Sequence, residues 1–256
     1  MRRLFLFSTL IAASGLLFAG KGRASEAAED LIRKGDVFYA RLEPSEALKF
    51  YLPAEKLDPN NPQLLVRIAR QYRHLMCETS AKEQKRQLGT TAVDYAQRAV
   101  ALAPNDPDTQ LAVAISYGKL LPLVGTGDQI ADSRLIKAAV DKVLALDSNN
   151  DLGWQILGRW YRALADVSGV KRALAQMAYG KLPPAKYEDA VKCFEKAIEL
   201  NPNRLMHYIE LGRTYGQMGK PIEARKYISK GLAMPNTEKD DPETKDLGRE
   251  LLAKLH

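Results

Sequence analysis

The stretch KYEDAVKCFEKAIELNPN, residues 186–203, predicts one helix followed by a turn. Ala190, Phe194 and Ala197 are spaced four and then three residues apart, and Pro202 follows five residues later. Side chains with this spacing share one face of a helix, and proline is common just after a helix ends. The stretch therefore predicts a helix that buries a small, a bulky and a small residue against a partner helix.

The same four-then-three spacing recurs at other places along the chain. A second pattern, a large residue followed by apolar, small and aromatic ones, precedes each copy, most clearly at Trp154, Leu157, Gly158 and Tyr161. Because Gly or Ala lets a neighbouring helix approach closely, the two patterns predict pairs of packed helices. The further copies of the first spacing are Ala47, Tyr51 and Ala54; Ala92, Ala96 and Ala99; the looser Ile136, Val140 and Val143; and Ala224, Ile228 and Gly231.

These helix pairs resemble the tetratricopeptide repeat, and the resemblance covers nearly all of residues 25–256. It implies an all-α, tetratricopeptide-like helical-hairpin solenoid with lengthened middle repeats and a C-terminal capping helix. The closing helix, with Asp240 or Asp241 as its cap, is expected to cover the open face of the last repeat. The repeats are assigned to residues of about 28–61, 62–106, 107–150, 151–204 and 205–237, and the closing helix to about 240–256.

The three middle repeats are longer than the first by 11, 10 and 20 residues, each time between the two helices. The first insert, CETSAKEQKRQL at 77–88, is rich in helix formers and is expected to be helical. The third, RALADVSGVKRALAQMAYGKLPP at 162–184, is expected to extend one helix and return through a second segment. The middle insert predicts a loop from Pro122 to Asp128.

With these inserts, residues from about 64 to 255 resemble the regulator of microtubule dynamics family. The most specific part is the long segment 162–184 followed by Tyr187, Glu188, Asp189 and Ala190, which plain tetratricopeptide proteins lack. The resemblance implies an all-helical scaffold that binds other proteins. In the animal members it implies microtubule association and placement at organelle membranes.

The N-terminus differs from the rest of the chain. Arg2 and Arg3 precede an uncharged apolar run at residues 4–20, and small residues allow a cut after Ala24. We therefore expect residues 1–24 to be an export signal, with a membrane anchor at 4–20 as the alternative. Removing 1–24 would lower the net charge from +7 to +3, which weakens the hypothesis that the protein binds nucleic acid.

The sequence offers little chemistry for catalysis. Its three histidines lack a second ligand at metal spacing, and no phosphate loop or nucleophile motif is present. Cys77 and Cys193 are too few for a disulfide framework, and a packed side chain is the better reading for Cys193. We expect neither an enzyme nor a cofactor.

A binding surface is the remaining candidate. In tetratricopeptide stacks the first helix of each repeat lines the groove, and its groove positions are unusually basic here. Guanidinium groups match carboxylates in bidentate geometry, so an acidic or extended protein segment is the expected partner. The alternatives are a solvated face whose charges pair internally, or a groove filled by the inserts. Tubulin tails are a further partner implied by the family. The predicted residues are Arg70, Arg73, Lys119, Arg159, Arg162 and Arg213.

Overall fold

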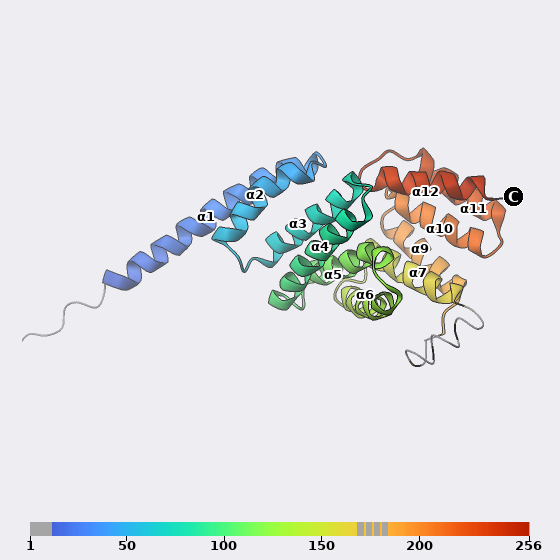
Figure 1. The fold of residues 1–256 in the computed structure, drawn as a ribbon, viewed down its shortest axis with the longest axis horizontal. Helices are drawn as coiled ribbons and strands as arrows, with labels where there is room; N and C mark the ends of the chain where they lie inside the picture. The colour runs from blue at the N-terminus through green and yellow to red at the C-terminus, as the bar shows by residue number, and fades with distance from the viewer. Residues whose placement is uncertain (1–11, 168–171, 173–175, 177–179, 181–183, 256) are drawn as a thin grey trace, which may run out of the picture.

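The computed structural model describes residues 12–167, 172, 176, 180 and 184–255, and the described residues form helices and turns without a strand (Figure 1). Five successive helix pairs stack side by side, and a last helix packs on the fifth pair. The pairs are α1 (Ala12–Ala40) with α2 (Pro44–Leu57), α3 (Pro62–Leu75) with α4 (Lys82–Leu102), α5 (Pro107–Leu120) with α6 (Thr126–Leu146), α7 (Asp151–Asp166) with α9 (Tyr187–Leu200), and α10 (Leu205–Gln217) with α11 (Pro221–Ala233), followed by α12 (Asp241–Ala253).

Side-chain caps mark where the first helix of the second, third and fourth pairs begins. Asn61, Asp106 and Asn150 each accept a hydrogen bond from a backbone N–H in the first turn of α3, α5 and α7, at 3.0, 2.8 and 2.9 Å. Such caps satisfy donors that a helix leaves unpaired at its start. Proline follows the first two caps at the first helical position, where its fixed backbone angle fits.

The predicted small–bulky–small faces are the core of the helix pairs, as expected. Ala190, Phe194 and Ala197 are fully buried in α9, and the equivalent residues in α2 and α4 are as well. The partner predicted for α9 is also confirmed, because Phe194 packs against Gly158 of α7. A Cβ added at Gly158 would lie 2.9 Å from the Phe194 ring, which explains why a glycine stands there.

The inserts of the second and third pairs lengthen the second helix of each pair. Helix α4 begins at Lys82, so the predicted helical character of 77–88 is largely confirmed after a 3₁₀ turn at Met76–Glu78. The predicted loop at 122–128 is wrong in extent, because α6 already begins at Thr126. Gly125 precedes this helix and its carbonyl accepts the first helical hydrogen bond, from Gln129 N–H at 2.9 Å. The third insert lies mostly outside the described residues.

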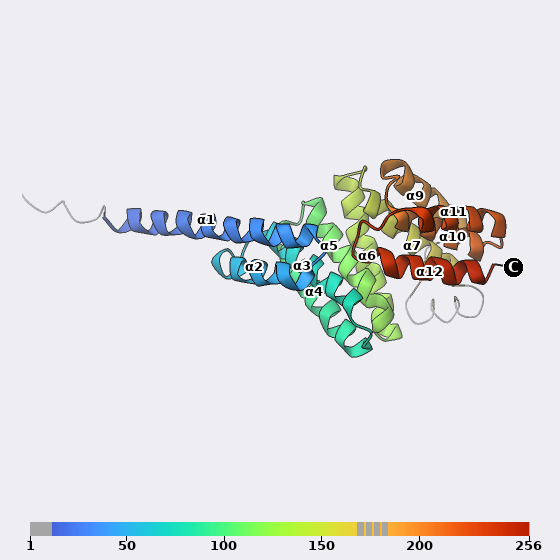
Figure 2. The same cartoon turned by 90° about the horizontal axis from the view of Figure 1, so that it is seen from above.

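Helix α1 projects beyond α2 in both views (Figures 1 and 2). It begins at Ala12 and continues past residue 24, whereas residues 1–11 lie outside the described part of the chain. Within the described part, no helix combines the length and the apolar character needed to cross a bilayer. Export and anchoring both stay predictions.

Helix α12 packs on α10 and α11, in the place expected for a closing helix. Its buried contact is Gly248, where an added Cβ would lie 3.2 Å from Ile209 and from Leu232. The leucines of α12 are only partly buried. Helix α12 therefore covers the last pair in two ways: its backbone approaches closely at Gly248, and its leucine side chains are partly buried.

Candidate protein-interaction surface

The first helices of the last four pairs form a continuous layer, in which α3 contacts α5, α5 contacts α7, and α7 contacts α10. All six predicted basic residues lie on these helices. They separate into two groups, each around one carboxylate. The first basic cluster is Arg70, Arg73 and Lys119 with Asp240, and the second basic cluster is Arg159, Arg162 and Arg213 with Glu210.

The side chains of the first basic cluster each have a partner in another element. Arg70 donates from Nη1 to the hydroxyl of Tyr39 in α1 at 2.7 Å, and its guanidinium lies 5.1 Å from that ring centroid. Arg73, only 5% exposed, donates from Nη1 to Ser116 Oγ in α5 at 2.9 Å. Lys119 Nζ lies 2.7 Å from Asp240 Oδ2.

The electrostatics of this cluster follow from burial beside several cations. Burial and the charge of Arg70 lower the pKa of Arg73 to about 9, so its guanidinium stays protonated at neutral pH. Burial and Arg73 lower the pKa of His74 to about 3, so the imidazole is neutral. Burial opposes ionisation of Asp240, but Lys119 outweighs it and the pKa of Asp240 is lowered. The cluster therefore holds a carboxylate in its charged form.

The second basic cluster surrounds Glu210, which is buried in the middle of α10. Arg162 Nη1 lies 2.5 Å from Glu210 Oε2 and donates to the Glu210 carbonyl at 3.2 Å. Arg159 Nε lies 3.5 Å from Glu210 Oε1. Burial favours the neutral acid, but Arg162, Arg159 and Arg213 lower the pKa of Glu210 to about 2. One carboxylate thus faces three guanidinium groups.

Arg73 and Arg162 occupy equivalent positions in two repeats and make equivalent contacts with the next repeat. Each lies eight residues after the large residue of its repeat, Leu65 and Trp154. Each also donates to a hydroxyl on the next first helix, Ser116 in one case and Thr214 at 3.4 Å in the other. These two arginines therefore join consecutive repeats, and they are buried rather than open to a ligand.

Sequence reasoning located the cations but missed the acids that accompany them. Glu210 follows the large residue Tyr208 by two positions and lies between the buried Ile209 and Leu211. A carboxylate at an apolar position of a helix was the available signal, because buried acids are rarely found unpaired. Asp240 or Asp241 was expected to cap α12. Asp240 does occupy the cap position, but its side chain makes no capping hydrogen bond and binds Lys119 instead.

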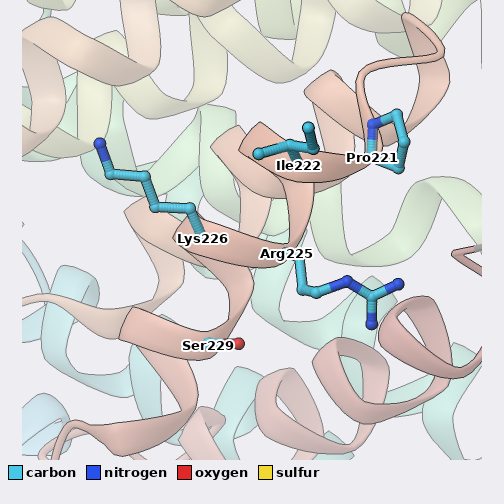
Figure 3. A pocket seen from close by; sticks show the side chains of 5 residues that line it. All are labelled: Pro221, Ile222, Arg225, Lys226 and Ser229. Carbon is cyan, nitrogen blue, oxygen red and sulfur yellow. The ribbon is translucent and has the colours of Figure 1, made fainter.

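A hollow elsewhere on the surface does not compete with the two clusters. It is formed by α11 alone, and two of its lining side chains, Arg225 and Lys226, point in different directions (Figure 3). Ile222 is 81% exposed, and Arg225 already donates to the Leu255 carbonyl at 2.8 Å. A single helix supplies only one wall, so a ligand there would stay largely in water.

Metal ligands and reactive thiols are two other kinds of group that a site could contain. None of them forms a group of three or more His, Cys, Asp or Glu side chains that could hold a metal ion. Burial raises the pKa of the Cys193 thiol to about 12, so at neutral pH it is a packed, unreactive side chain. The two basic clusters are therefore the main chemical feature of the layer formed by α3, α5, α7 and α10.

Comparison with known proteins shows the family of this chain. Residues 31–256 match the family model described as Regulator of microtubule dynamics protein 1-3. The chain belongs to this family. A regulator of microtubule dynamics protein 1 from Mus musculus is 26% identical over 99% of this chain and 85% of its own length. The protein 1 from Caenorhabditis elegans is 26% identical over 70% of this chain and 78% of its own.

Solved structures show the fold of this family member. A thermophilic TPR protein from Thermus thermophilus superposes with a TM-score of 0.64 at 17% identity, over 89% of this chain and all of that one. PilF from Pseudomonas aeruginosa superposes with a TM-score of 0.52 at 14% identity, over 91% and 90%. These likenesses establish a tetratricopeptide-like solenoid.

Proposed function

We propose that this regulator of microtubule dynamics family member is a non-enzymatic scaffold that binds an acidic, extended segment of another protein. One observation carries the proposal: each basic cluster of the first-helix layer holds three cations but one carboxylate. The remaining positive charge attracts further carboxylates, because guanidinium and ammonium groups form charge-assisted hydrogen bonds with them.

The side chains available to such a segment are the more exposed ones. The Arg159 side chain is 43% exposed, and its single long contact to Glu210 leaves guanidinium N–H groups open. Arg70, Lys119 and Arg213 are partly exposed. The buried Arg73 and Arg162 contribute charge and hold neighbouring helices in place. A peptide lying along the layer would meet these groups in succession.

The test uses a fluorescein-labelled peptide of alternating glutamate and alanine and the full chain. Arg159→Glu should weaken binding about tenfold and flatten its salt dependence, because a close attraction becomes a repulsion. Arg249→Glu is the matched control, since Arg249 lies on α12 and pairs with Asp246 of the same helix. Equal binding by wild type and Arg159→Glu contradicts the proposal.

We also propose that the scaffold acts outside the cytoplasm or tethered to a membrane. Support comes from the basic start, the apolar run at 4–20 and the small residues before a cut after Ala24. Mass spectrometry of the protein isolated from its native cell reads the first residue directly. A chain that begins at Met1 in the soluble fraction contradicts both export and anchoring.

Microtubule association is the second candidate, favoured by the names of the relatives. The same basic clusters suit the acidic tails of tubulin. Co-sedimentation with purified microtubules, with and without those tails, tests it. Pelleting that depends on the tails and on Arg159 supports this candidate. Equal pelleting without the tails contradicts the role of the tails, and no pelleting with intact microtubules contradicts the candidate.

A further inference from the structure

The segment that leads into α12 reaches far from its own repeat. We call residues 234–243 the C-terminal arm. From the end of α11 it runs back to the ends of α3 and α4, and α12 then returns along α10 and α11 (Figure 1). Its contacts join residues that are up to 197 positions apart in sequence.

Ion pairs hold the arm on the first half of the solenoid. Asp240 Oδ2 lies 2.7 Å from Lys119 Nζ, inside the first basic cluster. The neighbouring Lys239 Nζ lies 2.7 Å from Glu78 and donates to the Leu42 carbonyl at 3.0 Å, in the turn between α1 and α2. These two consecutive residues of the arm connect three repeats.

Further charged contacts lie on either side. Glu243 lies 3.5 Å from Lys85 of α4, and Glu238 accepts from Arg204 at 2.9 Å. These ion pairs are partly exposed: the two side chains of the Lys239–Glu78 pair are 23% and 40% exposed, and those of the Lys85–Glu243 pair 25% and 59%. Pairs exposed to this degree are individually weak. The Lys119–Asp240 pair is less exposed, at 27% and 19%, and is therefore the main contact that holds the arm.

The arm keeps its shape by itself. Asp241 is 1% exposed, and its Oδ2 accepts from the backbone N–H groups of Thr237 and Glu238 at 2.7 and 2.8 Å. This closed turn leaves the preceding carboxylate, that of Asp240, free to bind Lys119. A bend made within the arm, with a carboxylate presented outward, has the form of a bound peptide ligand.

We propose that the C-terminal arm is an internal ligand of the first basic cluster, and that an acidic segment of a partner protein binds there by displacing it. The proposal rests on the proposed function and names how the site is regulated. A tethered ligand competes at an effective concentration on the order of millimolar, so weak contacts suffice to keep the site closed. The partner segment would carry a carboxylate for Lys119 in an acidic stretch like the arm's own TEKDDPE, residues 237–243.

Cys77 reports whether the arm is closed. It lies in the 3₁₀ turn beside α3, and Lys119, Asp240, Glu243 and Lys85 act on its thiol. The charge of Asp240 also raises the pKa of the Cys77 thiol, so each labelling rate is divided by the thiolate fraction titrated in the same variant. The corrected rate in Asp240→Ala should rise about fivefold, the factor expected from losing one partly exposed ion pair. Cys193 is 4% exposed and stays slow. A wild-type rate in Asp240→Ala, with its fold verified by circular dichroism, overturns the proposal.

Two further variants control for folding and position. Lys239→Ala breaks the contacts to Glu78 and Leu42 and should raise the labelling rate in the same direction. Asp246→Ala removes a pair with Arg249 within α12 and should leave the rate unchanged. Faster labelling in Asp246→Ala would mean that α12 frays generally, which overturns the specific role of the arm.

The ligand is tested with a fluorescein-labelled synthetic peptide of residues 235–244. The Asp240→Ala chain should bind it up to about fivefold more tightly than wild type, because binding improves only as far as the internal competitor is weakened. The bound peptide should slow Cys77 labelling again, and adding Lys119→Glu should abolish binding. Equal binding by wild type and Asp240→Ala overturns the proposal.

Failure of this inference and failure of the proposed function give different results. One outcome is that Arg159→Glu loses the glutamate–alanine peptide while Asp240→Ala leaves both Cys77 labelling and peptide binding at wild-type levels. The proposal about the arm is then overturned, and the scaffold proposal stands. If Asp240→Ala opens the arm and binds the 235–244 peptide but Arg159→Glu changes nothing, the wider scaffold proposal is overturned.

Discussion

Gly212 of α10 lies where α10 and α11 approach each other closely. An alanine Cβ there would lie 2.6 Å from Ile228 Cγ1 and 2.9 Å from both the Ala224 carbonyl and the Ile228 backbone nitrogen. Gly216, one turn later on the same helix, is different. A Cβ at this position would meet only Leu255 at 3.5 Å and Ala224 at 3.8 Å, which are ordinary contacts. The two glycines form a matched pair for testing how the helices pack.

Two terms set the size of the effect. Replacing glycine by alanine inside a helix stabilises by about 0.8–1 kcal/mol at either position. Overpacking at position 212 costs about 1–3 kcal/mol, toward the upper end because two of the three close atoms are backbone and α11 must shift as a whole. We expect Gly212→Ala to destabilise by about 1–2 kcal/mol and Gly216→Ala to stabilise by about 0.5–1 kcal/mol.

Thermal and urea unfolding, followed by circular dichroism, measure both variants. A chain of this size shifts its melting temperature by about 2–4 °C per kcal/mol, so Gly212→Ala should melt about 2–8 °C lower and Gly216→Ala slightly higher than wild type. If Gly212→Ala is neutral or stabilising, the contact between α10 and α11 is misplaced. If both variants destabilise equally, local crowding does not explain the glycines.

Three further predictions concern the core and its charges. Glu210→Gln leaves Arg162 buried without a counter-charge and should destabilise by about 3 kcal/mol in urea unfolding, whereas a neutral result would show that the pair adds nothing. Folding lowers the pKa of Glu210 from 4.5 to about 2, so the stabilisation by its carboxylate is complete above about pH 4.5 and is lost as the pH falls toward 2. The urea midpoint of Glu210→Gln should therefore depend less on pH in that window than the wild-type midpoint does. Parallel plots of the two midpoints against pH would contradict this. Ala190→Phe inserts a ring into a fully buried face and should destabilise by about 1–3 kcal/mol, and an unchanged melting temperature would refute the repeat register.

Helix pairing was predictable from sequence because its signals are local and repeated. The spacing of Ala190, Phe194 and Ala197 identifies a buried face, and Gly158 supplies the matching gap in the partner helix. The start of α6 was less readable, because Gly125 and Gly127 look like a turn. Glycine also begins helices, and the carbonyl of Gly125 does so here.

Charge pairing was not predictable in the same way. Arg162 meets Glu210 at a separation of 48 residues, and Lys119 meets Asp240 at 121. The repeat pattern says that an arginine points toward the first-helix layer, but not whether the next repeat covers it. Arg73 and Arg162 are covered because the first helix of the next repeat carries a hydroxyl at the matching position.

The two basic clusters differ in what becomes of their carboxylate. Glu210 belongs to the middle of α10 and is 4% exposed, so it cannot leave without unfolding the helix. Asp240 precedes α12 and lies within the C-terminal arm, which is held mainly by partly exposed ion pairs, so it can leave while the helix pairs stay intact. A partner's carboxylate can only add to the second cluster, but it can replace the resident one in the first. If an acidic segment binds as proposed, its regulation would therefore belong to the first cluster, where Lys119 would exchange one acidic segment for another.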